Sequence, residues 1–215
     1  MSSRGILTLN TRELMNSPDF CRENGMKGHL SPELSQSLNE LISQIPGEGI
    51  EWVTNTMDWI YKNMNYIGVD KEADSYCSDW STLPREQLLE IVGTQKTAEI
   101  LNQGFVIDCE SRADVLAVMA RQNNIPARVS FAISHDLAEA PQGIHGVTHY
   151  FTEIFIDNNW IVFDPTTRIS LGLLADNVYE ENGFCLVDTQ KDAWEMGIKN
   201  LEDQSIVVNR FKEKL

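Results

Sequence analysis

Residues 104–131 read GFVIDCESRADVLAVMARQNNIPARVSF and contain, in order, a helix breaker, a helix and the start of a strand. Gly104 interrupts the preceding helical pattern. A new helix is marked by a stripe of small apolar residues. The stripe consists of Ala113, Leu116, Ala117 and Ala120. Asn123, Asn124 and Pro126 end this helix, and the β-prone run ARVSFAI follows at once. The stretch therefore predicts a helix packed on a β-sheet, within an α+β fold.

Two further helices are predicted upstream of this stretch. The first has Ser31 as its N-cap and Pro32 at its first helical position, and it ends at the Pro-Gly pair of residues 46–47. The second, which ends near residues 66–68, repeats apolar residues at helical intervals; these are Ile50, Val53, Met57, Ile60, Tyr61 and Met64. The polar residues 69–83 indicate a surface loop, and residues 84–102 a short helical pair.

Strands dominate the prediction downstream. Residues 147–164, VTHYFTEIFIDNNWIVFD, hold two β-branched and aromatic runs around Asp157, Asn158 and Asn159, which is typical of a hairpin. Beyond it, GFCLVD (183–188) and SIVVNRF (205–211) are each predicted as strands, with a short helix near residues 190–197.

Length and composition indicate one folded domain. With 215 residues and 42% hydrophobic content, the chain can bury a sizeable core. We expect residues 1–30 to form an N-terminal arm without chemistry of its own, and residues 31–215 to form one domain that holds the residues with candidate chemistry. The four cysteines, Cys21, Cys77, Cys109 and Cys185, are spread too widely for a zinc site or a disulfide scaffold, so we expect free thiols.

Charge and hydropathy exclude several partners and locations. The net charge of -15 opposes binding to nucleic acid or to an anionic membrane surface. No apolar run reaches the roughly 18 residues of a membrane span, and the start of the chain lacks the apolar core of a signal peptide. We therefore expect a cytoplasmic protein that binds neither nucleic acid nor membrane. The sequence carries no signal for an oligomeric state.

Three residues have the chemistry of a cysteine-dependent catalytic triad. Cys109 lies at the N-terminus of the predicted helix, where free backbone N–H groups and the helix dipole favour a thiolate. Such a nucleophile requires a base and a third group that orients the base. His149 and Asp164 lie on the two strands of the predicted hairpin, so their side chains can meet at one end of the sheet.

The order of these motifs resembles the transglutaminase-like superfamily. It comprises a Cys that opens a helix, NIPARV (124–129) after it, a strand His, and W-x-x-x-D-P-T at 160–166. The resemblance covers roughly residues 50–167. It implies a papain-like fold, with a helical N-terminal part whose catalytic helix packs against an antiparallel sheet. It also implies that Cys109 is the nucleophile, His149 the general base and Asp164 its orienter.

Departures from the family pattern surround the nucleophile. Many members have Gly two residues before the Cys, where this chain has Ile107, and animal transglutaminases have Trp where this chain has Glu110. The loss of Trp argues against protein crosslinking. The carboxylates of Asp108 and Glu110 would oppose a thiolate if they faced it. An oxyanion donor is expected from the Cys109 N–H plus a side chain, and Gln95, Gln103 and Trp80 are all candidates.

A metal site and a second nucleophile have less support in the sequence than the triad. His135, His145 and His149 lie within fifteen positions, but they lack the helical HExxH arrangement of a metalloprotease, so we expect no metal and no other cofactor. Cys77 and Cys185 are interpreted as packing residues rather than as second nucleophiles.

The sequence thus favours a cysteine hydrolase that cleaves an amide or peptide bond through a thioester, with a protein, a peptide or a small amide as substrate. A protein-glutamine transglutaminase or deamidase is the first alternative, because the same triad serves both reactions. The second alternative is a binding module that keeps the fold without catalysis.

Overall fold

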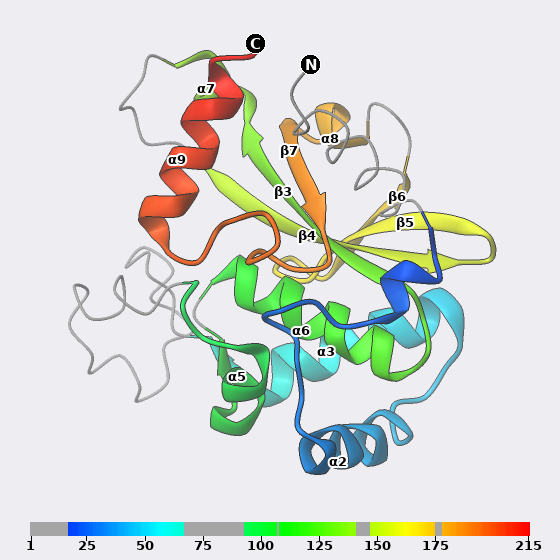
Figure 1. Ribbon diagram of the computed structural model, residues 1–215. Helices are drawn as coiled ribbons and strands as arrows, with labels where there is room; N and C mark the ends of the chain where they lie inside the picture. The colour runs from blue at the N-terminus through cyan, green and yellow to red at the C-terminus, as the bar shows by residue number, and fades with distance from the viewer. Residues whose placement is uncertain (1–16, 67–92, 107, 141–146, 175–177) are drawn as a thin grey trace.

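A computed structural model describes residues 17–66, 93–106, 108–140, 147–174 and 178–215 (Figure 1). Its architecture is a five-stranded antiparallel sheet with most helices packed on one face and the short helix α8 (Val178–Glu181) on the other. The predicted α+β fold is therefore confirmed. The predictions for the loop 69–83, for Cys77 and Trp80 within it, and for His145 lie outside the described residues.

The N-terminal helices follow their local sequence signals. Helix α2 (Pro32–Ile42) begins where predicted, because the Ser31 hydroxyl accepts a hydrogen bond of 3.2 Å from the Leu34 N–H. It ends at Ile42, before the predicted Pro-Gly stop, and the chain then enters helix α3 (Gly49–Asn63). Of the predicted pair at 84–102, the described residues contain α5 (Thr97–Gln103).

Helix α6 (Cys109–Gln122) is the centre of the molecule. It lies between the sheet and helices α2, α3 and α5, and every residue from Glu110 to Arg121 is buried (Figure 1). Its small residues allow this close packing, as the alanine stripe predicts. The polar residues of α6 are buried with the apolar ones, so each requires a partner from another element.

The main sheet has the strand order β6-β5-β4-β3-β7, and every neighbouring pair is antiparallel. Its strands are β3 (Ala127–Ser134), β4 (Thr148–Ile156), β5 (Asn159–Asp164), β6 (Ile169–Leu173) and β7 (Phe184–Gln190). The predicted hairpin joins β4 to β5, and its turn residues Asp157 and Asn158 have φ angles of 50° and 63°. Asn and Asp tolerate this left-handed conformation, which suits a tight hairpin. A separate parallel pair joins β1 (Asn65–Tyr66) to β2 (Phe105–Val106).

The C-terminal prediction was wrong in two places. SIVVNRF lies in a helix, α9 (Leu201–Lys212), and residues 191–197 form turns instead of a helix. The Asn200 side chain caps α9 by accepting a bond of 2.9 Å from the Asp203 N–H. This cap and the helical spacing of Val207, Val208 and Phe211 outweigh β-branched propensity, because a few Val and Ile residues fit either structure. Short elements η1 (Phe20–Arg22), α7 (His135–Glu139) and α8 (Val178–Glu181) complete the described fold.

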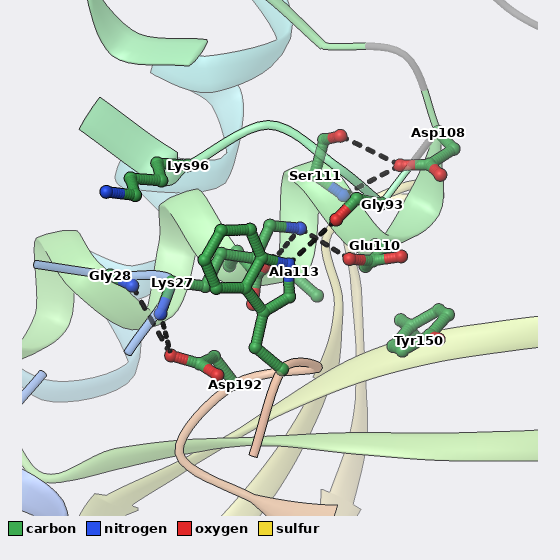
Figure 2. A network of polar contacts seen from close by, with 12 residues as sticks. Lys27, Gly28, Gly93, Lys96, Asp108, Glu110, Ser111, Ala113, Tyr150 and Asp192 are labelled. Atoms are coloured by element: carbon green, nitrogen blue, oxygen red, sulfur yellow. Dashed lines mark hydrogen bonds and ion pairs between the residues drawn. The ribbon is translucent and has the colours of Figure 1, made fainter. Parts of the chain in front are cut away.

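A buried lysine from the N-terminal segment anchors the first turns of α6 (Figure 2). The ammonium of Lys27 forms ion pairs with Glu110 and, at 2.6 Å, with Asp114. The Lys27 backbone N–H donates a bond of 2.7 Å to Asp192, in the segment after β7. All three side chains of the ion-pair cluster are at most 2% exposed. Part of the predicted arm therefore supplies a countercharge to the central helix.

The cluster predicts a strong stability effect at Lys27. Lys27→Met would leave two buried carboxylates without a countercharge, and we expect the free energy of unfolding at pH 8 to fall by about 3–5 kcal/mol. Urea unfolding followed by circular dichroism measures this loss. Lys62→Met is the matched control: Lys62 lies 3.9 Å from Asp58, its side chain is 68% exposed, and its loss should cost at most about 0.5 kcal/mol. Equal stability of the two variants would contradict the cluster.

The same cluster predicts how stability depends on pH. Burial outweighs the attraction of Lys27 and raises the pKa of Glu110 from 4.5 to about 8. The native protein therefore binds more protons at Glu110 than the unfolded chain does between these pH values, so stability falls as the pH rises through this window. Glu110→Gln removes this dependence. Urea titrations from pH 5 to 8 should show the stability of the wild type falling relative to Glu110→Gln, and parallel curves would contradict the assignment.

Candidate active site

Cys109 occupies the first position of α6, and its side chain is partly exposed. The N-cap is Asp108, whose carboxylate accepts bonds of 2.8 Å from both the backbone N–H and the hydroxyl of Ser111. This cap fixes the entry of the chain into the helix. The thiol therefore lies at the positive end of a 14-residue helix dipole, as the sequence predicts.

The two carboxylates beside Cys109 do not oppose it. Asp108 bonds to Ser111, and Glu110 points to Lys27 on the buried side of the helix (Figure 2). Because both groups are turned to other partners, their position next to the nucleophile is compatible with a thiolate. Their effect could not be settled from the sequence, since the partner of Glu110 lies 83 residues away.

His149 lies on β4 and contacts both other members of the predicted triad. Its Nε2 atom lies 3.0 Å from Oδ2 of Asp164, and its side chain also hydrogen-bonds to Cys109. The ring packs edge-on against Phe151 and stacks on Phe184, with centroid distances of 4.7 and 5.7 Å. Burial alone would lower the pKa of His149, but the bonds and charges of Asp164 and Cys109 outweigh it and raise the pKa to about 10.

Asp164 is the last residue of β5 and is held by the turn that follows it. Its carboxylate accepts bonds of 2.8 and 3.3 Å from the N–H groups of Thr166 and Thr167, and one of 2.8 Å from the Thr167 hydroxyl. Burial opposes ionisation of this carboxyl group, but the bonds to His149 and to the turn outweigh burial and hold the pKa of Asp164 below its usual value. Asp164 is thus a fixed anion beside His149.

The hairpin explains why His149 and Asp164 meet across 15 positions of sequence. Thr152 on β4 pairs with Phe163 on β5. The next positions in that register, Phe151 and Asp164, face the same side of the sheet, and His149 lies two residues further along β4. His149 and Asp164 are therefore diagonal neighbours on the same face of the sheet, close enough for long side chains to touch.

The structure also places the remaining candidates that lie among the described residues. Gln95 and Gln103 hydrogen-bond to each other at 3.0 Å beside α5. Cys185 lies half-buried on β7, and His135 begins α7. Within the described ranges, no cluster of three His, Cys, Asp or Glu side chains could hold a metal ion. In the same ranges, no helix has the length and apolar character to cross a membrane.

Two residues beside the site were not identified from the sequence. Arg112, one turn after Cys109, is buried and donates to the Thr166 carbonyl. The sequence did contain a signal for Arg112, because an arginine on the buried face of a helix of small residues requires a partner. Lys27 had no such signal, since the segment around it lacks periodicity.

Three solved structures similar to this chain carry the names of putative proteases or of a TGase. A protein of Cytophaga hutchinsonii named "putative cysteine protease" is 19% identical, over 82% of this chain and 53% of its own, with a TM-score of 0.49. A structure named as a TGase is 16% identical over 62% of this chain and 31% of its own, with a TM-score of 0.39. A "putative protease" of Parabacteroides distasonis is 12% identical over 76% of this chain and 31% of its own, with a TM-score of 0.37. This chain thus spans about half of the first protein and less of the others.

No curated protein matches the chain. The profile of the transglutaminase-like superfamily does match it, over residues 36–165. This span runs from α2 to the residue after Asp164, so it includes the helix that begins at Cys109 and the hairpin that carries His149. The resemblance seen in the sequence is confirmed, and with it the papain-like arrangement of a central helix on an antiparallel sheet. The chain belongs to the transglutaminase-like superfamily.

Proposed function

We propose that this protein is a cysteine hydrolase that cleaves amide or peptide bonds, with Cys109, His149 and Asp164 as its triad. The observation that carries the proposal is the continuous contact from the Cys109 thiol through the His149 ring to the Asp164 carboxylate. A nucleophile, a base and an orienting anion in one chain of hydrogen bonds are the parts that acyl transfer through a thioester requires.

Each residue of the triad has a distinct role in the proposed cycle. His149 accepts the thiol proton, and the Cys109 thiolate adds to the carbonyl carbon of the substrate. When the tetrahedral intermediate collapses, its C–N bond breaks, His149 protonates the leaving amine, and an acyl thioester to Cys109 remains. Water then adds to the thioester while His149 takes its proton. When this second intermediate collapses, the C–S bond breaks, the acid is released and His149 returns the proton to the Cys109 sulfur.

The role of Asp164 follows from which ring nitrogen it contacts. Since Asp164 holds Nε2 of His149, the other ring nitrogen, Nδ1, is left to exchange a proton with Cys109. The carboxylate also stabilises the imidazolium that forms when the thiol is deprotonated. The raised pKa of His149, about 10, expresses the same stabilisation.

Hydrolysis is favoured over crosslinking by the residue that follows the nucleophile. Glu110 is turned into the buried ion-pair cluster with Lys27 and Asp114. It does not supply the aromatic side chain that animal transglutaminases have at this position. The family suggests a protein or a peptide as the substrate. The alternative reaction, deamidation of glutamine, would release ammonia as its product.

The first prediction from this proposal concerns thiol reactivity. A thiolate paired with an imidazolium is alkylated well below pH 8, so we expect Cys109 to react with iodoacetamide faster than Cys21 and Cys185, whose thiol pKa values are raised by burial. His149→Ala should abolish the advantage, and His135→Ala is the matched control that should keep it. Peptide mass spectrometry measures each rate, and a Cys109 rate that is indifferent to His149 would refute the triad.

The second prediction concerns the reaction itself. On a library of peptides, the wild type should create new amino termini, which amine labelling and mass spectrometry detect, and Cys109→Ala should create none. Asp164→Asn should lower kcat/KM by about 10²–10⁴-fold, chiefly through kcat, because it removes the anion that supports the base. Ammonia release from glutamine peptides without new amino termini would replace peptide-bond cleavage with glutamine deamidation. Unchanged kcat in Asp164→Asn would contradict the role of Asp164.

A further inference from the structure

The backbone of Thr166, in the turn after Asp164, is held through both its N–H and its carbonyl group. The Thr166 N–H donates to Oδ1 of Asp164 at 2.8 Å, and the Thr166 carbonyl accepts a bond of 3.2 Å from Nη1 of Arg112. Arg112 lies on α6, three residues after Cys109, and is only 5% exposed. One short path therefore leads from the helix that carries the nucleophile to the carboxylate that orients the base.

Aromatic contacts hold the same guanidinium from another direction. The Arg112 guanidinium lies 5.6 Å from the centre of the Tyr61 ring on α3, and that of Arg168 lies 4.1 Å from the same ring. Arg168 closes the turn after Asp164, because its N–H donates a bond of 2.8 Å to the Asp164 carbonyl. The turn is thus attached to α6 through Arg112 and to α3 through Arg168.

We propose that Arg112 is a positioning residue that keeps the Asp164 carboxylate in contact with His149 by holding the Thr166 carbonyl. This inference rests on the proposed triad and deepens it. Arg112 does not touch the reacting atoms; it acts through the turn. Because Cys109 and Arg112 lie on the same rigid helical turn, the nucleophile and the support of the orienting anion share one element, which fixes their relative geometry.

The electrostatic and positioning effects of Arg112 on His149 have opposite signs, which makes the inference testable. Removing a cation near a histidine favours the imidazolium and raises the pKa of His149. Releasing Asp164 removes an anionic partner and lowers it. The groups that act on His149 are Asp164 and Cys109, and those that act on Asp164 are His149 and the two threonines of its turn, Thr166 and Thr167.

The test is the titration of the His149 ring by NMR in a Cys109→Ala background, which removes the thiol from the titration. In this parent, the pKa of His149 should stay above the ordinary value of 6.5. Adding Arg112→Met should lower the midpoint by about one pH unit, the size of one lost charge-assisted bond. A midpoint that is unchanged or higher would overturn the inference.

Arg121→Met is the matched control. Arg121 is also a buried arginine of α6 and donates bonds of 3.0 and 2.9 Å to the Ala127 carbonyl, but it lies at the other end of the helix. It should lower the thermal midpoint of unfolding as Arg112→Met does, and leave the His149 titration unchanged. A fall of the His149 midpoint in both variants would assign the effect to general destabilisation and overturn the inference.

Two further variants cover the remaining cases. Arg112→Lys keeps a hydrogen-bond donor and a positive charge, so the midpoint of the His149 titration should return most of the way to that of the parent. If Arg112→Met does not fold, Arg112→Gln replaces it; its amide ends two bonds short of the Arg112 Nη atoms, so it should show the same fall. An ordinary midpoint in the Cys109→Ala parent would refute the triad and the inference together. A raised parent midpoint that Arg112 substitutions leave in place would refute only the inference.

Discussion

The burial of α6 along its whole length is the constraint on which the rest of the structure depends. A helix between a sheet and three other helices cannot leave a charged side chain unpaired, because the cost of burying an isolated charge exceeds the whole stability of a small domain. Glu110 and Asp114 are paired with Lys27, Arg112 with the turn after β5, and Arg121 with the Ala127 and Lys191 carbonyls. Each pairing joins α6 to a different part of the chain.

These pairings fix the position of the helix end as well as its middle. The first turn is held by its own N-cap Asp108, by Lys27 on one side and by the turn that carries Asp164 on another. Cys109 therefore meets His149 at the junction of the helix and the sheet. In the proposed triad, a thiolate and an imidazolium would be stabilised by groups already in place, so little reorganisation would be needed when charge develops.

Much of the fold and the proposed triad could be predicted from the sequence, because their signals are local or periodic. The Ser31 cap, the alanine stripe of α6 and the Asp-Asn turn each depend on residues a few positions apart. The hairpin then brings His149 and Asp164 to one end of the sheet by register alone. The wrong strand at 205–211 shows the limit of such signals, since Val and Ile fit either structure until packing selects one.

The sequence by itself determined the central helix, the hairpin and the order of the three residues assigned to the triad, since caps, periodicity and turn chemistry act over a few bonds. Only the tertiary structure decided what surrounds them. Lys27 pairs with Glu110 across 83 positions, and Arg112 reaches Thr166 across 54. Such partners are chosen by the requirement to neutralise charges buried in folding. That requirement exists only once distant segments have packed together, so no local pattern records it.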